Sequence, residues 1–165
     1  MFIENILKNF FGIGSEDKKE LAKKVARSAS NLDFEMAIAA HENWKLRLRS
    51  FLAGTSSEKF VAEEICFDDR CDLGKWIYST GRSQLGTFPG FTALMGHHKM
   101  FHYAASNVVA LAQVGKIDEA GKILEMQFSQ HSSEVVRELQ ILRARCAAQL
   151  NGPLPDRTEQ TSIRP

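Results

Sequence analysis

The apolar residues of this chain recur at alternating steps of three and four along three long stretches. The first stretch carries Phe34, Ala37, His41, Trp44, Leu48 and Phe51. The second carries Phe91, Leu94, His98, Phe101, Ala105, Val108 and Ala112. The third carries Ile117, Ala120 or Gly121, Leu124, Phe128, His131, Val135, Leu139, Leu142, Cys146 and Leu150. This spacing places each set on one face of a helix and predicts antiparallel helices packed at a shallow angle.

The residues between these stretches predict how the long helices are connected. Asp69 or Asp72 could cap a short helix beside Cys71, and Gly81 would then end that helix. Gly115 separates the last two long stretches with almost no loop, so their helices should be antiparallel neighbours. The fold class that we predict is all-α: an antiparallel four-helix bundle with a short extra helix carrying Cys71.

Composition divides the chain into three regions. Residues 1–30 combine an amphipathic start with a charged stretch, which favours a helical extension used for docking or self-association. Residues 31–150 form the predicted helical bundle. Residues 151–165 contain three of the four prolines and are expected to be a disordered tail.

Charge and cysteine content narrow the functional classes. Twenty-one basic and twenty acidic residues leave a net charge of +1, which argues against a nucleic-acid partner. No stretch has the roughly 20 consecutive apolar residues of a membrane span, and the N-terminus lacks the layout of a signal peptide. Three irregularly spaced cysteines suggest no disulfide framework. We therefore expect a soluble cytoplasmic protein.

The stretch GHHKMFH holds three histidines, of which two share a helix face. His98 and His102 are four residues apart and lie one above the other, whereas His97 diverges from His102 and is expected at the surface. His41 lies on the inward stripe of the first helix, where a buried imidazole needs a hydrogen-bond partner or a metal. Spacing alone leaves both readings open: ordinary core histidines, or ligands of one ion.

Cys71 completes a possible ligand set. It precedes the short helix, whose backbone N–H groups should favour a thiolate, and Arg70 and Lys75 should act in the same direction. Three histidines and one cysteine would form a closed tetrahedral zinc site from His41, Cys71, His98 and His102.

Several motifs resemble those of the chemoreceptor zinc-binding domain family. CDLGKW, from Cys71 to Trp76, is similar to the Cys-x-Leu/Phe-Gly-x-Trp motif at the core of that family. AAHENWKLRLRSFL resembles its first helix, and LGTFPGFTALMGHHKMFH resembles its loop and third helix with paired histidines. The pieces follow the family's order from about Asp33 to Val109, so we expect a stand-alone member of the family.

The resemblance implies a function and a ligand set. Matching positions give Zn²⁺ ligands at His41, Cys71, His98 and His102. Gly74 would permit close approach of the short helix to a neighbour, Trp76 would cover the site, and Trp44 would pack beside His41. The implied role is a zinc sensor in bacterial chemotaxis or cyclic-di-GMP signalling, cytoplasmic and homodimeric, with a chemoreceptor or a diguanylate cyclase as its partner.

The remaining candidates have simpler interpretations. His131 could compete as a ligand but is absent from the family motif, so we expect a position around the site or an ordinary half-exposed residue. Cys66 lacks the spacing of a zinc knuckle or a redox pair with Cys71, and Cys146 is expected in the core.

No nucleophile elbow, P-loop or paired-carboxylate pattern occurs, and a closed zinc sphere disfavours catalysis, so we predict a non-enzyme. The alternatives are an interaction module with a permanent zinc staple and, less favoured because no Glu-x-x-His pairs occur, a di-iron or haem bundle.

Overall fold

The computed structural model describes residues 32–88 and 90–150, and within them the chain is helical, with no strand. The predicted all-α class is confirmed. The expected extension over residues 1–30 and the expected tail over residues 151–165 lie outside the described part of the chain.

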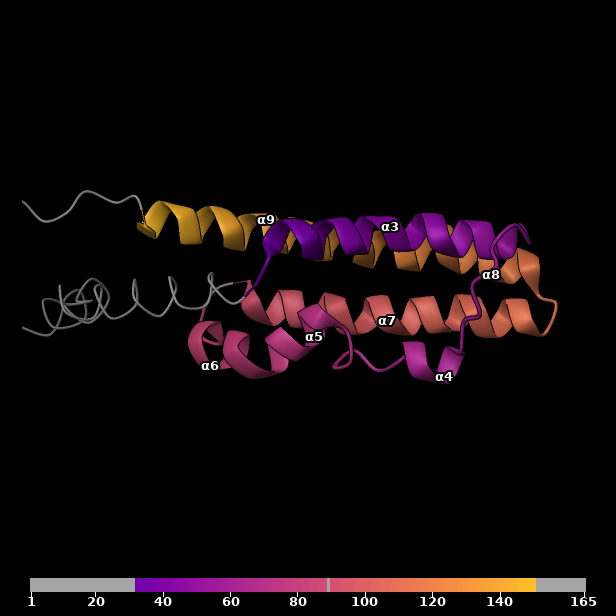
Figure 1. Ribbon diagram of the computed structural model, residues 1–165, viewed down its shortest axis with the longest axis horizontal. Helices are drawn as coiled ribbons and strands as arrows, with labels where there is room; N and C mark the ends of the chain where they lie inside the picture. The colour runs from indigo at the N-terminus through magenta and orange to yellow at the C-terminus, as the bar shows by residue number, and fades with distance from the viewer. Residues whose placement is uncertain (1–31, 89, 151–165) are drawn as a thin grey trace, which may run out of the picture.

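Three long helical rods form the body of the bundle, as Figure 1 shows. The first is α3 (Phe34–Leu52) and the second is α7 (Phe91–Gln113). The third begins with α8 (Ile117–Ile123), passes through the π-helical segment η2 (Leu124–Phe128) and continues as α9 (Ser129–Leu150). All three follow the apolar stretches that the sequence pattern predicts.

Short helical segments take the fourth side, against α7 (Figure 1). They are α4 (Ala62–Ile65), α5 (Asp72–Trp76), the π-helical η1 (Ile77–Gly81) and α6 (Arg82–Leu85). The prediction that Gly81 ends the short helix is wrong. A π turn at this glycine lets the helical path continue to Leu85.

The turn between α7 and α8 follows the sequence prediction. Gly115 has a φ of 78°, in the left-handed region that glycine adopts at little cost. Its N–H donates to the carbonyl of Ala112, which satisfies one of the open carbonyls at the end of α7. The chain therefore reverses within a few residues, and α8 and α9 pack against α7.

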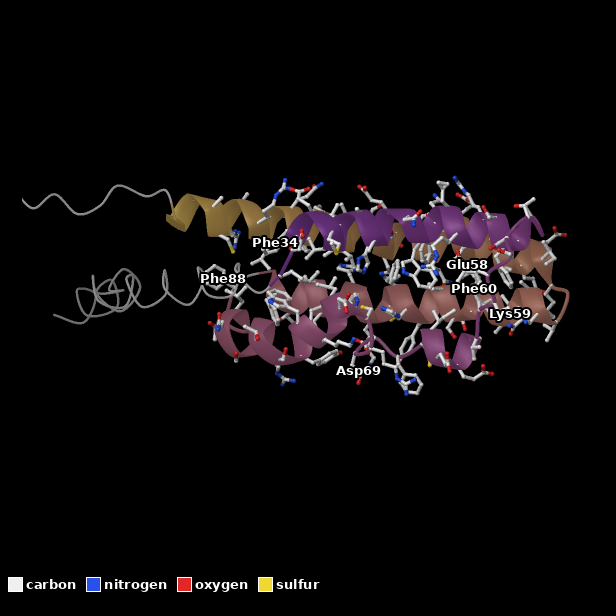
Figure 2. The ribbon with its side chains drawn as sticks, viewed as in Figure 1. Phe34, Glu58, Lys59, Phe60, Asp69 and Phe88 are labelled. Atoms are coloured by element: carbon white, nitrogen blue, oxygen red, sulfur yellow. The ribbon has the colours of Figure 1, made fainter. Side chains whose placement is uncertain are left out.

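An aromatic core joins the long helices to the covering segment. Phe101 of α7 lies 4.8 Å, ring centroid to ring centroid, from Phe128 of η2, and Trp44 of α3 lies 5.8 Å from Phe60. Figure 2 shows Phe60 between α3 and α7, where its side chain is buried. The backbone carbonyl of Phe60 also accepts a hydrogen bond from the Gln113 side chain, so the loop after α3 is fixed to the end of α7.

The π-helical segment η2 interrupts the regular α-helical hydrogen bonding of the last rod. A π turn takes one residue more than an α turn, because its hydrogen bonds span i to i+5. After Phe128 the next buried side chain is Ser132, His131 is only half-buried, and the later stripe positions Val135 and Leu139 are buried as predicted. The sequence pattern, which assumed regular α-helical steps, had placed His131 on the inward stripe.

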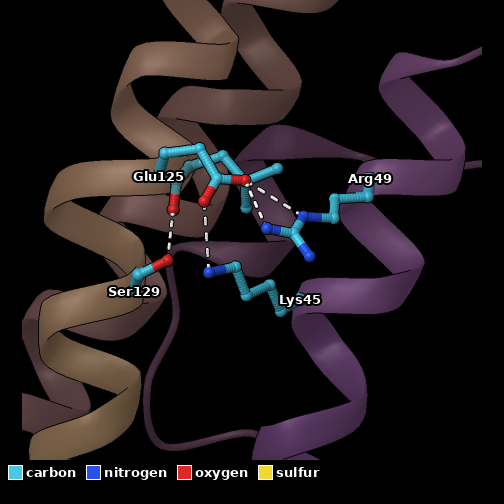
Figure 3. A network of polar contacts seen from close by, with 5 residues as sticks. Lys45, Arg49, Glu125 and Ser129 are labelled. Carbon is cyan, nitrogen blue, oxygen red and sulfur yellow. Dashed lines mark hydrogen bonds and ion pairs between the residues drawn. The ribbon is translucent and has the colours of Figure 1, made fainter.

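A polar network ties α3 to η2 on the outside of the bundle (Figure 3). Arg49 donates two hydrogen bonds to one carboxylate oxygen of Glu125, at 3.0 and 2.7 Å, and Lys45 lies 3.2 Å from the other oxygen. Ser129 donates to the carbonyl of Leu124, within the π-helical region. These pairs are exposed to solvent and contribute little stability each.

Among the described residues, none of the helices is both long enough and apolar enough to cross a membrane.

Candidate metal centre

Three metal-binding side chains meet between α5 and α7. The ligand atoms of Cys71, His98 and His102 all lie within 4.8 Å of one another, and we call these three residues the Cys–His cluster. Cys71 Sγ lies 3.2 Å from His98 Nε2. His98 and His102 come from successive turns of α7, with ring centroids 4.7 Å apart, as their spacing of four predicts.

Cys71 is positioned as the N-cap of α5. The N–H of Gly74 donates to its Sγ at 3.3 Å, so the cysteine itself performs the capping that the sequence pattern assigned to Asp69 or Asp72. Gly74 packs directly against the preceding loop. A Cβ at this position would overlap the carbonyl oxygen of Asp68 and lie 2.8 Å from its carbonyl carbon. Glycine is therefore required for the close approach, as the family motif implies.

Backbone carbonyls orient two of the histidines. His102 donates through Nδ1 to the carbonyl of Ile65 at 2.7 Å, and His41 donates through Nδ1 to the carbonyl of Ala37 at 2.8 Å. Each bond fixes the proton on Nδ1 and leaves the lone pair on Nε2. Both Nε2 atoms are buried and have no partner within the described residues.

His41 lies next to the Cys–His cluster and is not one of the three residues that define it. Its ring centroid is 5.5 Å from that of His98 and 4.8 Å from that of Phe101. The side chain is only 4% exposed, so its unpaired Nε2 cannot be satisfied by bulk water. A buried imidazole with an unsatisfied acceptor is costly unless a further group binds it.

Burial keeps the three histidines neutral. Desolvation is the largest cause in each case: it lowers the pKa of His41 to about 4 and that of His98 to about 2, and it also lowers the pKa of His102. Mutual repulsion adds to the effect, because His102 disfavours a charge on both other rings. Neutral imidazole is the form that coordinates a metal.

The expectation that Cys71 has a lowered pKa is wrong for the metal-free site. Burial raises the pKa of this thiol and outweighs the N–H groups of Leu73 and Gly74, which act in the opposite direction. The carboxylates of Asp72 and Asp68 raise it further. The expected cations point elsewhere: Lys75 pairs with Asp72, and Arg70 lies over the ring of Phe67. A positive ion is therefore needed to hold a thiolate here.

The metal-free protein is expected to lose stability as the pH falls from 6.5 towards 4. An unfolded histidine takes up a proton near 6.5, whereas folded His41 does so only near 4, so acid favours the unfolded chain. Each such histidine removes up to about 1.4 kcal/mol per pH unit, or about 3 kcal/mol for His41 over this window. Denaturant unfolding in the presence of a chelator at pH 7 and pH 5 measures the loss, and equal stabilities would contradict it.

The other candidates lie away from the Cys–His cluster. His97 is half-buried, not at the surface, and its Nδ1 lies 3.2 Å from Nδ1 of His131. Cys66 is half-buried and donates its thiol to the carbonyl of Glu63, whereas Cys146 is buried in the core as predicted. The structure therefore does not bring His131 or Cys66 to the cluster.

The two tryptophans differ in their relation to the cluster. Trp44 packs edge-on to Phe101, at 6.3 Å between ring centroids, in keeping with its expected place near His41. Trp76 is buried against Phe34 and Phe91 at the start of the bundle, so it supports α5 from the core side.

A cavity of about 460 Å³ opens beside the cluster. His41, Cys71 and His102 line it together with apolar side chains of α3 and α5. Small molecules in solvent thus have a route to the cysteine sulfur.

The carbonyl groups of Ala37 and Ile65 belong to the site, although no motif in the sequence indicates them. Every residue has a main-chain carbonyl, so residue types do not indicate which carbonyl accepts a hydrogen bond from a site residue. Ala37 lies one turn before His41, which is the only available signal, and Ile65 is brought to His102 by the tertiary fold alone.

The donor set fits a metal ion. In a regular tetrahedral zinc site, bond lengths of about 2.0–2.3 Å place nitrogen and sulfur ligands about 3.4–3.6 Å apart. The separations in the cluster, from 3.2 Å up to a limit of 4.8 Å, bracket that value. Buried, unpaired nitrogens beside a sulfur atom are the arrangement that a thiophilic cation satisfies.

The protein is a helical bundle in which the Cys–His cluster, a group suited to a metal ion, lies between the long helices and a short covering helix. Residues 41–109 match the family model described as the chemoreceptor zinc-binding domain. The match contains the whole Cys–His cluster and His41. Comparisons with the curated proteins and with the solved structures gave no match.

Proposed function

We propose that this chain is a cytoplasmic, non-enzymatic zinc sensor of bacterial signalling, with His41, Cys71, His98 and His102 as ligands. The observation that carries the proposal is the convergence of the Cys71 sulfur with buried, neutral imidazoles inside the family-matched segment. Four protein ligands close a tetrahedral sphere and leave no position for a substrate or a catalytic water.

The four residues divide between a rigid part and a covering part of the fold. His41, His98 and His102 stand on α3 and α7, which are long and packed through the core. Cys71 stands at the start of α5, a helix of five residues that is too short to be stable alone. Zinc, when bound, ties this segment to the long helices and stabilises the thiolate.

Release of Cys71 is the step that we propose as the signal. A two-electron oxidant such as hypochlorous acid reaches the sulfur through the cavity, transfers its oxygen to give a sulfenic acid and leaves as chloride. The oxidised sulfur is no longer a thiolate ligand. The α5 segment then loses one of its anchors, and a partner that contacts it experiences a changed surface.

The partner that we propose is a chemoreceptor or a diguanylate cyclase, with self-association into a homodimer. Support comes from the family match. Sedimentation of zinc-loaded and zinc-free protein tests the homodimer: a dimer in the zinc-loaded form supports it, and a monomer in both forms removes it.

The second candidate function is an interaction module with a permanent zinc staple. The shortness of α5 favours it, because such a segment could need the metal simply to fold. Circular dichroism with and without a strong chelator separates the two functions. A sensor keeps its helical signal and shows a local change in near-ultraviolet signal or NMR shifts around α5, whereas a stapled module loses helix throughout.

A further inference from the structure

A second pair of histidines lies on a different side of α7 from the Cys–His cluster. His97 follows Met95 and Gly96 on α7 and is adjacent in sequence to His98, so the two side chains diverge by about 100° around the helix. His97 instead meets His131 of α9, a residue 34 positions away. His131 lies outside the family-matched segment, so this pair is not part of the matched pattern.

The two rings face one another through the same nitrogen. Nδ1 of His97 and Nδ1 of His131 are 3.2 Å apart, and the ring planes are inclined by 40° with centroids 5.5 Å apart. Two imidazole nitrogens bound to one ion at about 2.0–2.1 Å in a tetrahedral site lie about 3.4 Å apart. The observed separation therefore suits a shared metal ion as well as a shared proton.

The surroundings of the pair favour a cation that enters from solvent. Both rings are half-buried, and two helices that pack against each other hold the ligands without a mobile loop. Glu134 lies three residues after His131 on α9, on the same side of the helix, and its charge acts on that ring. Its carboxylate also pairs with Arg137 at 2.7 Å, and its negative charge acts near the histidine pair.

We infer that His97 and His131 form a second metal site, bridging α7 and α9, for a divalent transition metal that favours imidazole, such as Ni²⁺, Cu²⁺ or Zn²⁺. Without metal, one Nδ1–H donates to the other Nδ1. On binding, that proton moves to Nε2 of its own ring, and both Nδ1 lone pairs face the ion. Water completes the coordination sphere, and the nearby negative charge of Glu134 favours the cation. Because the sphere contains water, binding is weaker here than at a closed four-ligand site.

Nickel titration of the zinc-loaded protein tests the site, with zinc and nickel measured separately on the same sample. We expect wild-type protein to bind an additional equivalent of Ni²⁺ without releasing zinc. His131→Gln should weaken Ni²⁺ binding by at least about tenfold, the lower end of the cost of losing even a supporting partner of a ligand. Glu134→Gln should weaken it less.

Zinc content serves as the internal control for the fold of each variant. His131→Gln that keeps its zinc and its helical signal but takes up Ni²⁺ as tightly as wild type would overturn the inference. So would wild-type protein that binds no Ni²⁺ beyond its zinc. If zinc itself is absent from wild type while Ni²⁺ still binds in a manner that depends on His131, the second site stands and the proposed sensor fails.

Discussion

Cys71→Ser is expected to reduce the zinc content of the purified protein from one equivalent to below about half an equivalent. A serine hydroxyl at this position is a poor zinc ligand, and the remaining histidines cannot close the tetrahedral sphere. We expect the affinity for zinc to fall by at least about 100-fold, the upper end of the cost of losing a group that merely supports a ligand. Competition with a chromophoric chelator measures this change.

Cys66→Ser is the matched control. Cys66 lies five residues earlier, is also half-buried, and donates its thiol to a main-chain carbonyl instead of facing the Cys–His cluster. It should keep the wild-type zinc content. Equal zinc contents in Cys71→Ser and wild type would remove Cys71 from the ligand set and leave the site without its thiolate.

Gly74→Ala is expected to destabilise the protein by about 3 kcal/mol or more, at the upper end of the cost of overpacking. The added methyl group would overlap the main chain of Asp68, which cannot rotate away as a flexible side chain could. The helix α5 would have to shift and carry Cys71 with it, so zinc affinity should fall as well. Thermal or denaturant unfolding of the zinc-loaded protein measures the first effect.

Gly121→Ala separates this clash from the general effect of replacing a helical glycine. A Cβ at Gly121 in α8 would meet no atom within 4 Å, so alanine there should stabilise the helix by about 0.5–1 kcal/mol. Opposite signs for the two substitutions are the expected result. A Gly74→Ala variant as stable as wild type would mean that α5 does not pack against the loop before it.

The long helices could be predicted from sequence because their apolar stripes are long and regular. The apolar side chains that form the stripes of α3 and α7 face the core as expected, and those of Leu48 and Val108 are fully buried. The π turns could not be predicted, because their hydrogen bonds depend on packing and leave no periodic signal. The helical path beyond Gly81 was therefore not predicted, whereas His131 is half-buried, as one of its two expected positions allows.

The candidate site could be predicted in its residue types but not in its electrostatics. Spacing selected His98 over His97 as the partner of His102, and a motif supplied Cys71. The sequence suggested a lowered pKa for the Cys71 thiol, but desolvation raises it. The burial that causes this desolvation depends on the tertiary structure around α5, which the sequence pattern does not give. For the same reason no pattern in the sequence pointed to the carbonyl of Ile65.

The π turn at Leu124–Phe128 affects how this chain should be aligned with its homologues. It contains one residue more than the α turn that it replaces, so a homologue with a regular helix here lacks that residue. The correct alignment then has a one-residue gap inside this segment. Without the gap, each later residue is compared with a position one residue away, about 100° around the helix. Covariation and conservation in α9 are meaningful only after that gap has been placed.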